Sequence, residues 1–152
     1  MTRFVIDASV AVKWVVAEEG TEQAVSLLSS HSFAAPELLV AECANILWKK
    51  VRLSELTAQE AMLAARLLQQ AEIELHPMRA LLERATELAM TLDHPAYDCL
   101  YLALAMVNDW RFVTADTRFL GKARQASPDV AAAILSLEEA AGDSRPAILI
   151  WE

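Results

Sequence analysis

The stretch that decides the fold is FVIDASVAVKW, residues 4–14. Three apolar residues of this stretch lead directly into the carboxylate of Asp7. A bare charge is costly where an apolar strand ends, because that position is normally withdrawn from water. We therefore interpret Arg3–Ile6 as a buried strand that ends in a functional acid, although a cap or loop carboxylate is the simpler alternative.

Short β-rich runs recur along the chain, and longer Ala- and Leu-rich stretches with helical spacing separate them. The predicted strands are Arg3–Ile6, Ser32–Ala35, Glu72–Leu75, Arg111–Thr114 and a fifth within Val130–Leu135. Helices are predicted over Glu37–Val51, from a capping box at Thr57 to about Ala71, over Met78–Leu92, over Ala96–Asn108, from Asp116 through Lys122, and after Ser136. This alternation indicates an α/β sandwich with a parallel sheet.

Composition excludes several classes of protein. The chain has 152 residues, of which 55% are hydrophobic and 22% charged, so a disordered chain is excluded. Two cysteines are too few for a disulfide framework, and charges interrupt every apolar run before it could span a membrane. Asp7 also cuts short the apolar run that a signal peptide would need. We expect a single domain over residues 1–152 in a reducing, cytoplasmic compartment.

The net charge of −8 argues against a protein that holds nucleic acid through a broad basic surface. It does not exclude nucleic acid as a substrate, because bound divalent metal ions supply positive charge locally.

Four acids fall near one edge of the predicted sheet. Two of them follow strands directly, one lies on the helix after the second strand, and one lies in the first turn of the helix that Pro95 opens: Asp7, Asp116, Glu42 and Asp98. The carboxyl ends of parallel strands and the amino ends of the following helices share that edge, where open α/β sheets bind ligands. Taken singly, these acids are also compatible with helix caps, a helix-dipole partner and a solvated glutamate, but their shared position at one edge makes these alternatives weaker.

Clustered carboxylates repel one another unless a cation is present, and Mg²⁺ or Mn²⁺ prefers such hard oxygen ligands. One or two ions in this pocket could support in-line attack on a phosphodiester by a metal-activated water. The chain has no Ser/His/Asp or Cys/His arrangement for a covalent intermediate.

Four segments resemble the motif blocks of PIN-domain ribonucleases, and most of all the VapC-type toxins of toxin–antitoxin pairs. The segments are FVIDASVAVKW, PELLVAECANIL, YDCLYLALA and FVTADTRFL, which span Phe4 to Leu120. The resemblance implies a three-layer α/β/α sandwich with a five-stranded parallel sheet, Mg²⁺ or Mn²⁺ as cofactor, and endonucleolytic cleavage of RNA. It also implies a small cognate antitoxin and a homodimer.

The resemblance places the acidic metal-binding quartet on Asp7, Glu42, Asp98 and Asp116. Its hydroxyl near the last acid falls on Thr114, and its small polar residue after the first acid falls on Ser9. Asn45 lies one turn beyond Glu42 on the same helix face. We expect these three side chains to hydrogen-bond to a ligand carboxylate or to bound water.

The remaining polar residues carry weaker expectations. Arg118 and Lys122, with Arg124, are candidates for contacts with RNA phosphates. We expect Cys43 and Cys99 to be small core residues, and His94 to cap a helix or face solvent rather than approach substrate. The segment Arg145–Glu152 could add an edge strand or cover a dimer surface.

Other functions stay open. A PIN nuclease in RNA maturation would need no antitoxin, and a PIN-like binding module would lack catalysis. A haloacid-dehalogenase-like phosphatase also starts with a strand that ends in Asp, but it requires a second Asp where this chain has Ser9.

Overall fold

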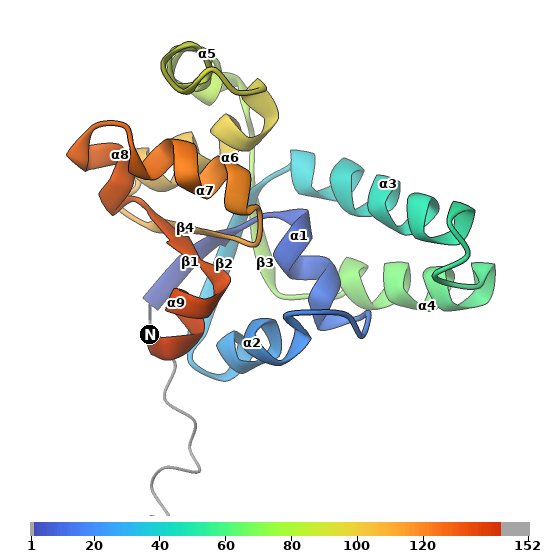
Figure 1. Cartoon of the computed structure of the whole chain (residues 1–152). Helices are drawn as coiled ribbons and strands as arrows, with labels where there is room; N and C mark the ends of the chain where they lie inside the picture. The colour runs from blue at the N-terminus through green and yellow to red at the C-terminus, as the bar shows by residue number, and fades with distance from the viewer. Residues whose placement is uncertain (1, 144–152) are drawn as a thin grey trace, which may run out of the picture.

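The computed structural model describes residues 2–143, and it contains a single five-stranded sheet with all strand pairs parallel. The spatial order of the strands is β3-β2-β1-β4-β5 (Figure 1). The strands are β1 (Thr2–Ile6), β2 (His31–Pro36), β3 (Ile73–His76), β4 (Arg111–Thr114) and β5 (Ile134–Ser136). The predicted α/β fold with a five-stranded parallel sheet is confirmed.

Helices cover both faces of this sheet. The α-helices are α1 (Ala8–Ala11), α2 (Thr21–Ser26), α3 (Leu38–Arg52), α4 (Ala58–Gln69), α5 (Leu82–Leu92), α6 (Ala96–Val107), α7 (Thr117–Arg124), α8 (Pro128–Ala132) and α9 (Leu137–Asp143). Single 3₁₀ turns are η1 (Val12–Trp14), η2 (Leu27–Ser29) and η3 (Arg79–Leu81). Figure 1 shows α5 to α8 on one side of the sheet, α1, α2 and α9 on the other, and the α3–α4 hairpin projecting beyond them.

The core forms where β1 and β4 meet α6. The side chains of Phe4, Val5 and Ile6 in β1 are buried, as are Phe112 and Val113 in β4. Helix α6 packs across β1, β2 and β4, and half of its residues are buried. Burying apolar surface of this extent is the main contribution to stability in a domain of this size.

Most predicted elements are found within a few residues of their expected bounds. Thr57 and Glu60 form the predicted capping box, with Thr57 N donating to the glutamate at 2.8 Å. Ser136 and Glu139 form the same reciprocal pair at the start of α9.

Two local predictions need correction, and two short helices are additional to the predicted elements. The predicted helix Met78–Leu92 begins with the 3₁₀ turn η3 and becomes α-helical only at Leu82. The fifth strand starts at Ile134, because Ser127 caps Val130 N and Pro128 opens helix α8 at the expected strand start. Helices α1 and α2 between β1 and β2 were not predicted, since each has no more than six residues.

Strands β1 and β4 are neighbours although a long segment of chain separates them, and the strand order reverses between them. Such a reversal opens a crevice at the carboxyl ends of the strands. Within residues 2–143, every helix is too short or too polar to span a bilayer. The segment Arg145–Glu152, with its expected strand or dimer cover, lies outside the described residues.

Candidate metal centre

Side chains from four separate parts of the chain line one cavity of about 350 Å³ at the carboxyl edge of the sheet. Asp7 follows β1 and Asp116 lies beyond the end of the neighbouring strand β4. Glu42 is on α3, and Asp98 is in the first turn of α6. The fold therefore brings together the four acids that the sequence places at this edge.

Asp7 is the most deeply buried of the four, with only 5% of its surface exposed. Its Oδ1 accepts hydrogen bonds from Ser9 Oγ at 2.5 Å and Val10 N at 3.2 Å, and its Oδ2 accepts one from Thr114 Oγ1 at 2.7 Å. Burial raises the pKa of Asp7 to about 6, and the charge of Asp98 adds to this rise, while the three hydrogen bonds oppose it. The carboxylate is therefore ionised at neutral pH at an energetic cost, which a bound cation would offset.

The hydroxyls of Ser9 and Thr114 also join the two strand ends. Ser9 Oγ accepts from Ala115 N at 3.3 Å, and Thr114 Oγ1 accepts from Asp116 N at 3.1 Å. Both side chains lie beside Asp7, where a hydroxyl could fix the direction of a ligand carboxylate.

Glu42 is held by a residue that sequence reasoning missed. Tyr101 on α6 donates a short hydrogen bond from its hydroxyl to Glu42 Oε1. Burial raises the pKa of Glu42, as does the charge of Asp98, while the bond from Tyr101 lowers it. Burial and the neighbouring Glu42 both raise the pKa of Tyr101, so its hydroxyl stays protonated and continues to donate.

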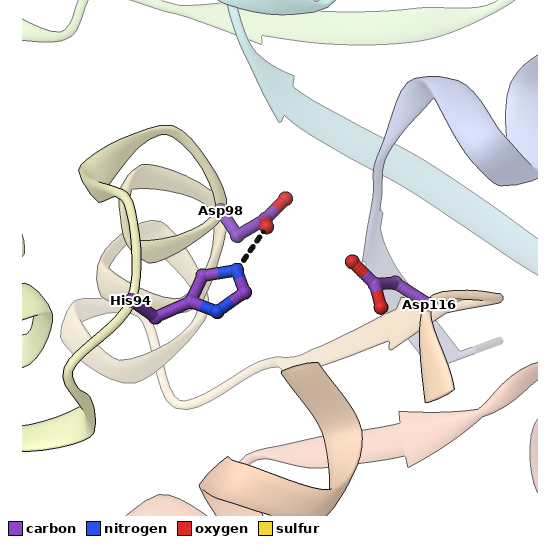
Figure 2. A group of neighbouring side chains, drawn as sticks. All are labelled: His94, Asp98 and Asp116. Carbon is purple, nitrogen blue, oxygen red and sulfur yellow. Dashed lines mark hydrogen bonds and ion pairs between the residues drawn. The ribbon is translucent and has the colours of Figure 1, made fainter. Parts of the chain in front are cut away.

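Asp98 and Asp116 lie close to a third side chain with potential ligand atoms, that of His94 (Figure 2). One potential ligand atom from each of these three residues lies within 4.8 Å of the others. Asp116 caps α7 through Oδ1, which accepts from Arg118 N at 3.0 Å and Phe119 N at 3.1 Å. These bonds use one oxygen of the carboxylate and leave the other for a further partner.

His94 does not occupy the position expected of it. Its side chain is only 9% exposed, and Nε2 lies 2.6 Å from Asp98 Oδ2. The prediction of a capping or solvated histidine is therefore wrong, because the turn between α5 and α6 directs the ring inward against Phe119, at 4.7 Å between centroids.

The donor set fits a divalent cation of the Mg²⁺ or Mn²⁺ type. Four carboxylates converge on one cavity, and burial holds the pKa values of two of them, Asp7 and Glu42, above their usual range. Ions with a preference for oxygen ligands relieve both the repulsion and the loss of hydration. Cys43 and Cys99 are buried, and burial raises the pKa values of their thiols to about 12 and about 11, so neither supplies a thiolate.

The remaining candidates differ in their surroundings. Asn45 is exposed and lines the cavity one turn after Glu42. Arg118 is exposed, and no side-chain partner for it is found among residues 2–143. Lys122 donates from Nζ to Asp93 O at 2.7 Å, and Arg124 pairs with Glu139. Of the three basic side chains, Arg118 is thus the most available for a phosphate.

Tyr101 could have been found from the sequence. It is an aromatic residue with a polar end in an otherwise apolar segment, three residues after Asp98 and so on nearly the same helix face. His94 has only its four-residue spacing from Asp98 as a signal.

Comparison with known proteins agrees with the fold. The chain is similar in fold to PAE2754 from Pyrobaculum aerophilum, with a TM-score of 0.64 and 20% identity over 93% of this chain and 88% of that one. It is also similar to the sarcin-ricin loop cleaving toxin VapC20 of Mycobacterium tuberculosis, with a TM-score of 0.60 and 15% identity over 78% of this chain and 93% of that one. A third similar structure is VapBC2 from Rickettsia felis bound to a promoter DNA fragment, with a TM-score of 0.61 and 14% identity over 89% of this chain and 98% of that one. No curated protein sequence matches the chain. The PIN domain profile matches residues 4–125, and the chain therefore belongs to the PIN domain family of nucleases.

Proposed function

We propose that this protein is a divalent-metal-dependent endoribonuclease and the toxin partner of a small antitoxin. The observation that carries the nuclease proposal is the convergence of Asp7, Glu42, Asp98 and Asp116 on one cavity at the switch point of a parallel sheet. Without a bound cation, these four carboxylates would oppose folding, because burial removes part of their hydration and they repel one another.

These four residues would hold Mg²⁺ or Mn²⁺, which supplies a Lewis acid that lowers the pKa of water and offsets phosphoryl charge. The chain's own part is to hold the carboxylates in place. Ser9 and Thr114 fix both oxygens of Asp7, and Tyr101 fixes one oxygen of Glu42. Such rigid hydrogen bonding keeps ligand atoms from rearranging as charge develops during hydrolysis.

RNA is supported as the substrate by the setting of the cavity and by the solved relatives. Asp116 lines the cavity, and Arg118, which follows it by two residues, is exposed. Arginine binds phosphate oxygens with two parallel hydrogen bonds, so this position suits the backbone of an RNA strand. One structural neighbour is described as a toxin that cleaves the sarcin-ricin loop, which is an RNA.

An antitoxin partner is supported by the structural neighbours VapBC2 and FitAB, both solved on DNA fragments. The acidic cavity would be neutralised by a partner that inserts a basic side chain. Co-expression with the small open reading frame next to the gene tests this: a stable, inhibited complex is expected. Failure of the two products to bind at micromolar concentration would leave a nuclease without an antitoxin, as in RNA maturation. A homodimer is expected from the same family.

The nuclease proposal is tested by incubating mixed RNA with the purified protein in Mg²⁺, Mn²⁺ or EDTA. Cleavage is expected with either ion and not with EDTA. Asp7→Asn should abolish cleavage, whereas Asp109→Asn, an exposed acid outside the cavity, should cut like the parent. Equal rates for the parent and Asp7→Asn would disprove the site. Absence of metal binding in calorimetry, together with no cleavage, would indicate a binding module instead.

A further inference from the structure

The pair formed by His94 and Asp98 is more enclosed than an ordinary surface ion pair. The His94 side chain is 9% exposed and that of Asp98 is 25% exposed, with 2.6 Å between Nε2 and Oδ2. An ionised carboxylate has no hydrogen to donate, so the shared proton belongs to Nε2. His94 Nδ1 is buried and has no hydrogen-bond partner among residues 2–143. Among residues 2–143, the ring therefore makes a single hydrogen bond, and its partner is Asp98.

The turn that carries His94 is fixed at several points. Asp93 ends α5 in the left-handed conformation with φ of 50°, and Pro95 precedes α6. His94 N donates to Ala89 O at 3.1 Å, and Lys122 Nζ donates to Asp93 O at 2.7 Å. The position of the imidazole is thus determined by the backbone as well as by its contact with Asp98.

Helix α7 connects this turn to the last acid of the cavity. The helix begins at the cap formed by Asp116, packs Phe119 against the His94 ring, and places Lys122 on the turn. One short helix thereby sets the relative positions of Asp116 and of the His94–Asp98 pair. Figure 2 shows the Asp98 carboxylate and the His94 ring side by side, joined by their hydrogen bond, with Asp116 across from both.

We propose that His94 is a positioning residue, whose Nε2–H fixes the Asp98 carboxylate so that one oxygen is held and the other is presented to the metal ion. This inference rests on the proposed function, because it assumes that Asp98 is a ligand. Hydrogen bonds to ligating carboxylates typically contribute 10–100-fold in metal affinity. His94 acts through Asp98 and is not itself a ligand.

The test measures Mn²⁺ affinity by calorimetry, without RNA, for the parent and three His94 variants. His94→Phe keeps a ring against Phe119 but removes the donor, and should weaken binding by about tenfold or more while the melting temperature of the metal-free protein changes little. His94→Gln places an amide N–H near the position of Nε2, and should bind within about threefold of the parent. His94→Asn carries the same amide on a side chain too short to reach, and should bind as weakly as His94→Phe.

The Gln and Asn pair keeps the test valid if the Phe variant fails to fold, because those two side chains differ in reach and not in chemistry. His76 provides a matched control, since its Nε2 also contacts a carboxylate, Glu74 Oε1, at 2.7 Å, but lies outside the cavity. His76→Phe should leave Mn²⁺ affinity unchanged.

Three results would overturn the inference. The first is parental affinity in both His94→Phe and His94→Asn, and the second is equal weakening in His94→Gln and His94→Asn. The third is a ¹⁴N coupling to bound Mn²⁺ in pulsed electron paramagnetic resonance that disappears in the His94 variants, which would make His94 a direct ligand. The proposed function fails separately, and this inference with it, if the parent binds no Mn²⁺ or if Asp7→Asn binds it as tightly.

Discussion

The two sides of the acidic cavity hold their carboxylates in different ways. On the inner side, Asp7 and Glu42 lose much of their hydration and are held by the hydroxyls of Ser9, Thr114 and Tyr101. On the outer side, Asp98 and Asp116 are only partly buried and are held by nitrogen donors, which are the His94 ring and backbone N–H groups of α7. The inner side therefore determines most of the cost of an empty site, because burial raises the pKa values of Asp7 and Glu42.

The largest effect expected from this difference is on cleavage. Asp7→Asn should abolish detectable cleavage, a loss of at least about a thousandfold, because it removes the buried carboxylate that would hold the metal ion against the developing phosphoryl charge. Asp116→Asn should reduce it by only about tenfold, since an asparagine oxygen still caps α7 and Asp116 is less buried than Asp7. Rates with saturating Mn²⁺ check the order, and the reverse order would contradict the comparison.

The next effect is the dependence of stability on pH. The pKa of Asp7 rises from 3.8 to about 6 on folding, so the folded state binds more protons than the unfolded state between these values. Its contribution to stability is full below about pH 3.8 and is lost as pH rises through 6, by about 3 kcal/mol. The free energy of unfolding in urea should fall with rising pH by this amount in the metal-free parent and not in Asp7→Asn. Parallel pH profiles would show that the buried carboxylate carries no such cost.

Bound metal ions should oppose the loss of stability at higher pH. Protons compete with a cation for Asp7, so Mn²⁺ should raise the melting temperature more at pH 7.5 than at pH 5. The variant Asp7→Asn serves as the control, because its gain should be small at both pH values. An equal gain in the parent at both pH values would place the ion away from Asp7.

A smaller effect is expected from the hydroxyl of Tyr101. Tyr101→Phe keeps the ring stacked on Phe112, at 5.5 Å between centroids, but leaves Glu42 without its donor. Cleavage and Mn²⁺ affinity should fall by about tenfold. Circular dichroism melting separates this from a packing defect. Unchanged affinity would mean that the inner side does not depend on its hydroxyl donors.

The smallest effect concerns the two cysteines that lie next to the ligands in sequence. Burial raises the pKa values of Cys43 and Cys99, so alkylation at pH 8 should be at least about tenfold slower in the native protein than in urea. Mass spectrometry after timed quenching measures this. Rapid native modification with loss of Mn²⁺ binding would place a thiol in the cavity.

The sequence predicts one part of the site well for a topological reason. Asp7 and Asp116 follow strands, and parallel strands end at one edge, so their proximity depends only on the order of the strands. The caps at Thr57 and Ser136 are predicted well for a different reason, because each depends only on residues a few positions apart.

The partners of the acids are harder to predict because they depend on how the helices cross. Tyr101 and Glu42 are 59 residues apart, and they meet only because α6 and α3 approach at the cavity. His94 depends on the conformation of the turn at Asp93, which has a positive φ that its sequence does not require. Helices α1 and α2 are too short for a periodic signal.

The bond from Thr114 to Asp7 joins residues 107 positions apart. A chain emerging from the ribosome therefore holds Asp7 and Glu42 long before β4 and Asp116 are made, and the cavity cannot close until they appear. Contacts between residues so distant in sequence form late in folding. The order of synthesis thus makes the acidic site one of the last features to form, since its four carboxylates can meet only after Asp116 has been translated.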